Sequence, residues 1–190
     1  MMIDDLRAIL QEQKDAVTGI PPERTALRAA ADDNLEMVAA YLQDGDSFLD
    51  SGDTVNALAA YCYGSGWLHC GAAIGFLAVP DTRCPLHEPI RPLQSSAHEK
   101  IREKTHRYEL LLSLARAAVK PAAEEGTALH AMACQVISVT ALYEAQGRRL
   151  LARRDYENAL ACFSYGHGWL DAAVRGGLFS VTSERELFTI

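Results

Sequence analysis

The sequence lacks the residue patterns of several common functional classes. Its five cysteines include no Cys-x-x-Cys pair, which argues against a disulfide framework. It contains no His-Glu-x-x-His, no dinucleotide-binding glycine fingerprint, no phosphate-binding glycine loop and no Ser/Cys–His–Asp order, so nothing indicates an enzyme or a cofactor. Basic residues are also scarce, with a net charge of −7. A nucleic-acid partner is therefore not expected, because phosphate binding needs a concentrated basic surface.

The chain also lacks the features of secretion and membrane insertion. Met1 to Leu6 contain neither the basic nor the apolar region of a secretory signal, and we expect a cytoplasmic protein. Thr54 to Val79 contain no Asp, Glu, Lys or Arg, which fits either a membrane span or a helix buried on all sides. Asn56, His69 and four glycines between residues 64 and 75 favour burial, so no membrane partner is expected.

What the sequence does contain is an internal duplication. It matches itself without gaps at an offset of 102 residues, from about residues 3–79 to 105–181. Between Asp53 and Val79, 12 of 27 positions are identical to those of Asp155 to Val181, which is far above chance. We divide the chain into a first repeat (1–79), a linker (80–97) with four of the seven prolines, a second repeat (98–181) and a tail (182–190).

Each repeat contains three segments with apolar residues spaced near the helical period. No convincing strand alternation is present. Asp53 and Asp155 are placed to cap the third helix of each repeat. The sequence therefore predicts an all-α fold, a helical bundle built from two tandem three-helix repeats related by a pseudo-twofold axis.

The third helices share a face that carries a Tyr and a Trp four residues apart. These residues are Tyr63 and Trp67 in the first repeat and Tyr165 and Trp169 in the second, and this spacing makes each pair adjacent. One interpretation is a core pair whose hydroxyl and indole N–H find backbone or Asn partners. The other is a ligand pocket lined by aromatic rings.

The second repeat differs from the first along one stripe of this helix. His167, Asp171 and Arg175 stand four residues apart, where the first repeat has Ser65, His69 and Ala73. Asp171 could pair with either neighbour, as in a surface row of ion pairs or in a site where it holds a histidine. We assign no catalytic residue, and the candidate ligand-binding or interaction residues are Tyr63, Trp67, His69, Tyr165, His167, Trp169, Asp171 and Arg175.

Four zinc ligands could come from His69, Cys70, Cys84 and His87 if the linker folded back on its helix. Neighbouring residues of a helix point about 100° apart. His69 and Cys70 therefore cannot easily share one ion, and no metal is predicted.

The two repeats also differ in charge. Residues 1–79 hold 4 Lys/Arg and 12 Asp/Glu, whereas residues 98–190 hold 12 and 11. Near the end of the second helix, Asp46 corresponds to Arg148. This exchange of sign suggests that these helix ends face each other across the pseudo-twofold axis, as in a duplicated homodimer. The alternative is that both are solvated helix ends.

The residues Asp155 to Asp171, followed by Arg175 and Gly177-Leu178-Phe179, resemble the signature helix of an uncharacterised archaeal family, domain of unknown function 357. The resemblance covers the second repeat from about residue 98 to 181, with the first repeat, about 3–79, as a diverged copy. His69 and Ala73 there depart from the family-like Asp171 and Arg175. The resemblance implies a small bundle of antiparallel helices, and it brings no established activity or cofactor.

From these observations we expect a non-enzymatic helical scaffold or protein-interaction module, working as a pseudo-dimeric monomer or as a homodimer. The alternative is a small-molecule-binding protein or enzyme that uses Tyr165, His167, Trp169 and Asp171. A third hypothesis is an RNA-processing helical bundle of the nucleotide-binding HEPN type. Its Arg and His would have to lie further apart on one helix than Arg102 and His106, or Arg83 and His87, do.

Overall fold

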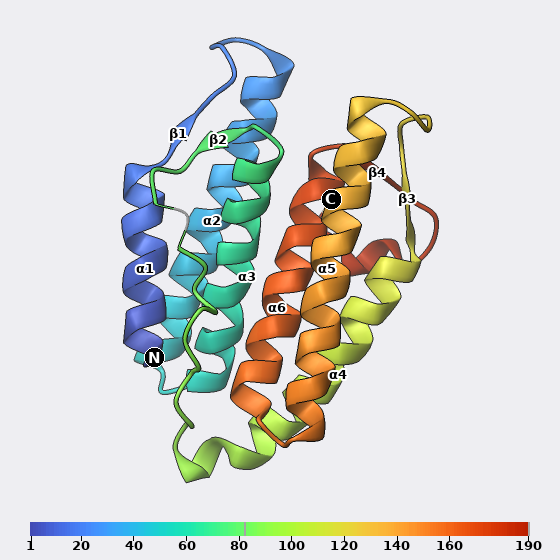
Figure 1. The fold of residues 1–190 in the computed structure, drawn as a ribbon. Helices are drawn as coiled ribbons and strands as arrows, with labels where there is room; N and C mark the ends of the chain where they lie inside the picture. Colours follow the sequence, from blue (N-terminus) through green and yellow to red (C-terminus); the bar gives the residue numbers. More distant parts are fainter. Residues whose placement is uncertain (82, 190) are drawn as a thin grey trace.

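The computed structural model describes residues 1–81 and 83–189, in which long helices dominate (Figure 1). The first repeat forms α1 (Ile3–Ala16), α2 (Ala26–Asp50) and α3 (Thr54–Ala73). The second forms α4 (His98–Ala117), α5 (Ala128–Ala152) and α6 (Tyr156–Arg175). Short 3₁₀ helices η1 (Ser95–Ala97) and η2 (Arg185–Leu187) lie in the linker and the tail. The predicted all-α bundle is confirmed, and no described helix has the length and apolar character needed to cross a bilayer.

The two repeats meet along α3 and α6, which run in the same direction in the middle of the bundle (Figure 1). A Cβ atom added to Gly66 would lie 2.4 Å from the carbonyl oxygen of Tyr165, and one on Gly168 would lie 2.3 Å from that of Tyr63. Only glycine permits such close approach. Because the same contact occurs twice with the repeats exchanged, the repeats are related by a pseudo-twofold axis.

Both third helices begin and end as local sequence dictates. The Asn56 and Asn158 backbone N–H groups donate to Asp53 and Asp155 Oδ1 over 3.2 and 3.3 Å, which confirms the predicted caps. Gly75 ends α3 with φ 81°, a left-handed conformation that glycine adopts without strain. The uncharged stretch is therefore helical only as far as Ala73.

Short strands follow the first and third helices of each repeat. β1 (Thr18–Gly19) pairs antiparallel with β2 (Leu77–Ala78), and β3 (Val119–Pro121) pairs with β4 (Phe179–Val181). They tie the end of each first helix to the end of the third helix. The sequence shows no alternation there, because two or three residues are too few to display a period.

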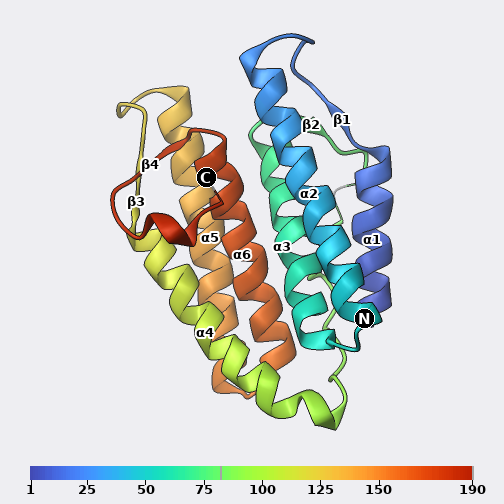
Figure 2. The same ribbon diagram turned by 180° about the vertical axis from the view of Figure 1, so that it is seen from behind.

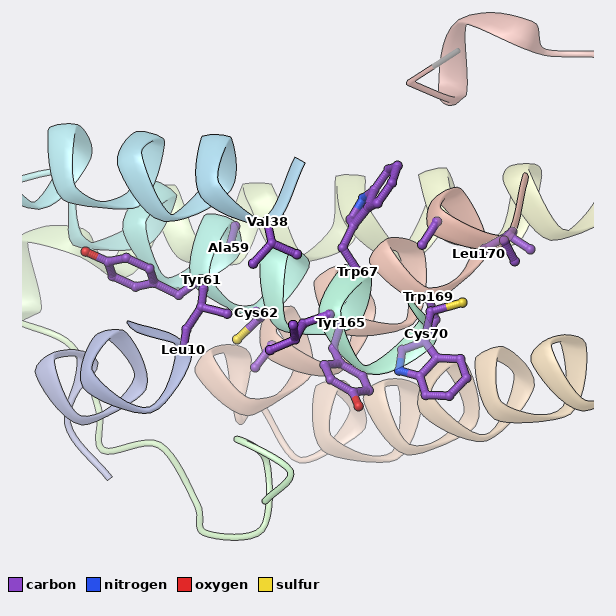
Figure 3. Close-up of a cluster of buried hydrophobic side chains, with 14 of the residues drawn as sticks. Leu10, Val38, Ala59, Tyr61, Cys62, Trp67, Cys70, Tyr165, Trp169 and Leu170 are labelled. Carbon is purple, nitrogen blue, oxygen red and sulfur yellow. The ribbon is translucent and has the colours of Figure 1, made fainter. Parts of the chain in front are cut away.

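The two tryptophans lie in the core on opposite sides of the α3–α6 pair (Figure 3). Trp67 is 0% exposed and Trp169 is 8% exposed. Neither indole N–H has a hydrogen-bond partner among the described residues. The expectation that these N–H groups would be paired is therefore wrong, and the rings act through volume and apolar contact.

Asp46 and Arg148, which carry opposite charges at equivalent positions, each form an ion pair within their own repeat. Arg7 Nε donates to Asp46 Oδ1 over 2.7 Å, and Arg148 Nε donates to Glu109 Oε1 over 3.1 Å. The offset of 102 makes Arg7 equivalent to Glu109, so each repeat holds the same ion pair with its charges reversed. Figures 1 and 2 show α2 and α5 on opposite sides of the α3–α6 pair. The hypothesis that these helix ends face each other is therefore wrong.

A third position changes together with this ion pair. The Tyr61 hydroxyl donates to Asp46 Oδ1 over 2.8 Å, and its equivalent in the second repeat is Phe163. Each ring lies against a glycine, because a Cβ on Gly45 would lie 2.3 Å from the Tyr61 ring and one on Gly147 2.5 Å from the Phe163 ring. Tyr is present where the neighbouring ion pair offers a carboxylate, and Phe where it offers a guanidinium.

Candidate functional site

Asp171, on α6, is fully buried and binds groups from two distant parts of the chain. Its carboxylate accepts hydrogen bonds from the Tyr63 hydroxyl over 3.0 Å, from the Thr189 N–H over 2.9 Å and from the Thr189 hydroxyl over 2.7 Å. Three donors offset the cost of burying this carboxylate. Asp171 therefore joins the first repeat, the second repeat and the C-terminal segment.

His167 and Arg175 also bind the C-terminal segment. His167 Nε2 lies 3.1 Å from the carbonyl oxygen of Leu187, which can only accept, so the neutral ring carries its proton on Nε2 and a lone pair on Nδ1. Burial lowers the pKa of His167, and the charge of Asp171 opposes that shift. Arg175 donates to Asp33 Oδ2 over 3.0 Å and to Thr189 O over 3.3 Å.

The side chains of His167, Asp171 and Arg175 thus pair with other groups and not with one another. Asp171 therefore pairs with neither His167 nor Arg175. Both predictions, a row of ion pairs and an Asp that holds the histidine, are wrong. These residues differ from Ser65, His69 and Ala73 because a different segment of chain packs over them.

The equivalent place in the other half is covered by the linker. The Tyr165 hydroxyl lies 2.8 Å from His69 Nδ1, and the Tyr143 hydroxyl lies 3.3 Å from Cys84 Sγ. Burial lowers the pKa of His69 to about 4. Tyr165 and His69 are the equivalents of Tyr63 and Asp171, so both halves form a cross-repeat bond at the same place, with a different partner for the tyrosine hydroxyl.

The four residues considered for zinc have separate environments. Cys70 is 0% exposed, whereas His87 is exposed and its Nδ1 lies 2.7 Å from the Cys84 carbonyl oxygen. His69 uses Nδ1 for its contact with Tyr165. Across residues 1–81 and 83–189 there is no group of three or more His, Cys, Asp or Glu side chains placed to hold a metal ion.

A cavity of about 310 Å³ opens at the junction of the repeats. We call it the junction cavity. Its walls come from α2, α3, α4 and α6, of which α2 and α4 lie in front of α3 and α6 in Figure 2. The lining residues are Tyr41, Asp44, Phe48, Asn56, Ala59, Ala60, Tyr63, Lys104, Tyr108, Leu111 and His167.

Two of the predicted candidate residues, Tyr63 and His167, line the junction cavity. Trp169, Tyr165 and His69 line a different cavity of about 350 Å³ beside the linker, and Trp67 is sealed in the core. The predicted set therefore does not converge on one pocket. The cavity wall supplied by α4 could not be found from the sequence, because it depends on how α4 packs across the other repeat.

Lys104 is the main residue that sequence analysis missed. Its side chain is 7% exposed, its Nζ donates to Asn56 Oδ1, and it lies 4.9 Å from the centre of the Tyr108 ring. Burial lowers the pKa of Lys104 to about 8. One turn earlier, Lys100 Nζ donates to Asp53 Oδ2 over 2.6 Å. These bonds attach α4 of the second repeat to the start of α3 in the first.

Comparison with known proteins gives one family and no described function. A family model described as "Protein of unknown function (DUF357)" matches residues 7–77 and again residues 107–179. The two matches fall one in each repeat. No curated protein and no solved structure matches the chain.

Proposed function

Because the chain belongs to the family described as protein of unknown function (DUF357), we propose its function from its own geometry. The protein is a non-enzymatic protein-interaction module that holds its partner in the junction cavity. The observation that carries this proposal is the cavity itself, of about 310 Å³ and walled by both repeats. A protein of a single repeat would lack the His167 and Lys104 sides of this cavity.

The chemistry of the lining suits binding. Aromatic rings with a few placed polar groups are typical of ligand sites, and the rings of Tyr41 and Tyr63 lie with centroids 4.5 Å apart. Asn56 and Lys104 supply polar groups, and the Nδ1 lone pair of His167 is not used by the hydrogen bond to Leu187.

Catalysis by the same residues is less well supported. The Asp171 carboxylate accepts hydrogen bonds from Tyr63 and Thr189, and His167 is oriented by a main-chain carbonyl group. An acid–base pair would need a carboxylate bonded to the histidine or a nucleophile within reach of it. No carboxylate of the described residues is hydrogen-bonded to His167, so binding is the better proposal.

We further place this interaction in the cytoplasm, with one chain as the working unit. The thiols of Cys62, Cys70, Cys84, Cys134 and Cys162 are free, as is typical of a reducing compartment. The contact of α3 with α6 already supplies the interface that two single repeats would use to dimerise.

The proposal is tested by filling the cavity. Ala60 lines it and is 8% exposed, so Ala60→Trp should occupy the space that a partner needs. Ala39→Trp places the same side chain on an exposed site of α2 and serves as the control. Peptide-display and small-molecule libraries are screened against wild-type protein, and dissociation constants of hits are measured on all three proteins.

We expect hits that lose at least about tenfold in affinity, equivalent to 1.4 kcal/mol, in Ala60→Trp and keep it in Ala39→Trp. Hits that bind all three proteins equally, or screens without hits, would overturn the proposal.

A further inference from the structure

We propose that the group bound in the junction cavity is an extended peptide segment of a partner protein, held by Asn56 as Asn158 holds the chain's own linker. This inference rests on the proposed function and names the kind of partner. It comes from comparing two equivalent grooves, one of which the chain itself fills.

In the second repeat, the linker lies against the start of α6. Ile90 N–H donates to Asn158 Oδ1 over 2.7 Å, and Asn158 Nδ2 donates to the Ile90 carbonyl oxygen over 3.1 Å. The Ile90 side chain is 4% exposed. Leu93 N–H donates to Glu157 Oε1 over 3.0 Å. Figure 1 shows this green segment running down the front of the bundle from β2 toward the start of α4.

One carboxamide therefore binds both main-chain groups of one residue. The N–H and C=O of a residue point to the same side when the chain is extended, as in a β ladder. An asparagine side chain offers one acceptor and one donor at a matching spacing. This contact recognises extended main chain and leaves the side chain free to fill an apolar space.

The junction cavity is the equivalent groove in the first repeat. Its residues Tyr41, Asp44, Phe48, Asn56 and Ala60 correspond, at the offset of 102, to five residues that line the groove beside the linker. These equivalents are Tyr143, Gln146, Leu150, Asn158 and Cys162. In the second repeat linker residues share that groove, and only about 220 Å³ remains.

Asn56 keeps part of the bonding capacity that Asn158 uses. Its Nδ2 donates to Asp53 Oδ2 over 2.6 Å, as Asn158 Nδ2 does to Asp155 Oδ1 over 2.8 Å. Its Oδ1 accepts from Lys104. One N–H and one lone pair remain, and Lys104 adds a donor for a second peptide carbonyl group.

The differences between the grooves indicate which peptide the cavity favours. Ala60 replaces Cys162 and leaves more room for an apolar side chain in the junction cavity. Asp44 replaces Gln146 and makes no ion pair with the residues that the structure describes. The first repeat also carries 4 Lys/Arg against 12 Asp/Glu. The favoured segment therefore has an apolar anchor residue and a basic residue nearby.

The probe is an acetylated and amidated peptide with the sequence of residues 86–94, LHEPIRPLQ, added to ¹⁵N-labelled full-length protein. A second peptide replaces Glu88 by Lys, and a third replaces Ile90 by Asp. We expect saturable shifts of the Asn56 side-chain amide and of the Ala59 and Ala60 main chain. The Lys peptide should bind more tightly, because Asp44 attracts its charge, and the Asp peptide should not bind.

The added peptide should bind the junction cavity before it binds the groove beside Asn158. In that groove it must displace the chain's own linker, which is tethered and therefore present at a high effective concentration. Asn56→Ala should weaken binding about tenfold through the loss of hydrogen bonds to the peptide main chain. Ala60→Trp keeps Asn56 but should block binding, so the test does not depend on the stability of Asn56→Ala. Ala39→Trp should bind as the wild type does.

The outcomes separate this inference from the proposed function. Small molecules that bind at Ala59 and Ala60, without binding of the two Ile-bearing peptides, would overturn the peptide assignment and leave the cavity as a binding site. Peptide shifts confined to Asn158 would also overturn it. No binding of any compound in the cavity would overturn both.

Discussion

The hydroxyl of Tyr63 in the first repeat donates a hydrogen bond over 3.0 Å to the buried carboxylate of Asp171 in the second. The equivalent bond joins Tyr165 to His69 over 2.8 Å. The duplication has kept the tyrosine in both places and changed its partner. Each bond takes one partner from each repeat, so neither repeat contains a complete site.

The two cross-repeat bonds should differ in strength. Tyr63→Phe removes a donor from a buried carboxylate and should lower the free energy of unfolding by about 1.5–3 kcal/mol, whereas Tyr165→Phe, which faces neutral His69, should cost about 1 kcal/mol. Urea unfolding of the two single variants measures this. An equal loss in both would show that the Asp171 charge is not important to the bond.

Stability should fall on acidification between about pH 6.5 and 4. Burial lowers the pKa of His69 to about 4 from 6.5, so the unfolded chain takes up a proton first as the pH falls. The stabilising contribution is present above pH 6.5 and is lost as the pH approaches 4, amounting to about 3 kcal/mol. Buried His167 acts in the same direction.

This pH dependence is measured by urea unfolding at pH 7.5 and 4.5. His69→Gln should reduce the difference between the two values, since Gln does not titrate. The matched control is His87→Gln, because His87 is exposed, and it should leave the difference unchanged. A pH difference that survives His69→Gln in full contradicts the assignment.

Close approach of α3 and α6 should make Gly66 intolerant of a side chain. Gly66→Ala places a methyl group 2.4 Å from the Tyr165 carbonyl oxygen and should cost more than about 3 kcal/mol. Gly64→Ala meets side-chain atoms at 3.1 and 3.2 Å, and its better helix propensity of about 1 kcal/mol should offset much of that contact. Thermal unfolding compares the two variants. Similar losses would mean that the helices separate readily.

The reversed ion pair should be transferable between repeats. Asp46→Arg alone leaves Arg7 against a like charge and removes the acceptor of buried Tyr61, and it should cost about 2 kcal/mol. The triple variant Arg7→Glu, Asp46→Arg and Tyr61→Phe recreates the second repeat's arrangement of Glu109, Arg148 and Phe163 in the first. It should recover most of the loss in a urea titration, and a triple variant no more stable than the single one would contradict the exchange.

The sequence predicts the local features of the fold. Helical periodicity and capping Asp53 and Asp155 act within a few residues, so they predict the helices and their starts. The offset of 102 residues predicts equivalent roles for Gly66 and Gly168. The segment from Asp155 to Asp171 resembles the signature helix of the family, and the comparison confirms that family.

The sequence by itself determined that the protein is a duplicated helical bundle, because repeats, caps and apolar spacing are properties of neighbouring residues. Only the tertiary structure decided which side chains meet across the repeats. The partners of His167 and Asp171 come from Leu187, Tyr63 and Thr189. The linker fills one groove, while α4 walls its equivalent and leaves it open. These choices depend on where connecting segments pack in space, and no local pattern records that.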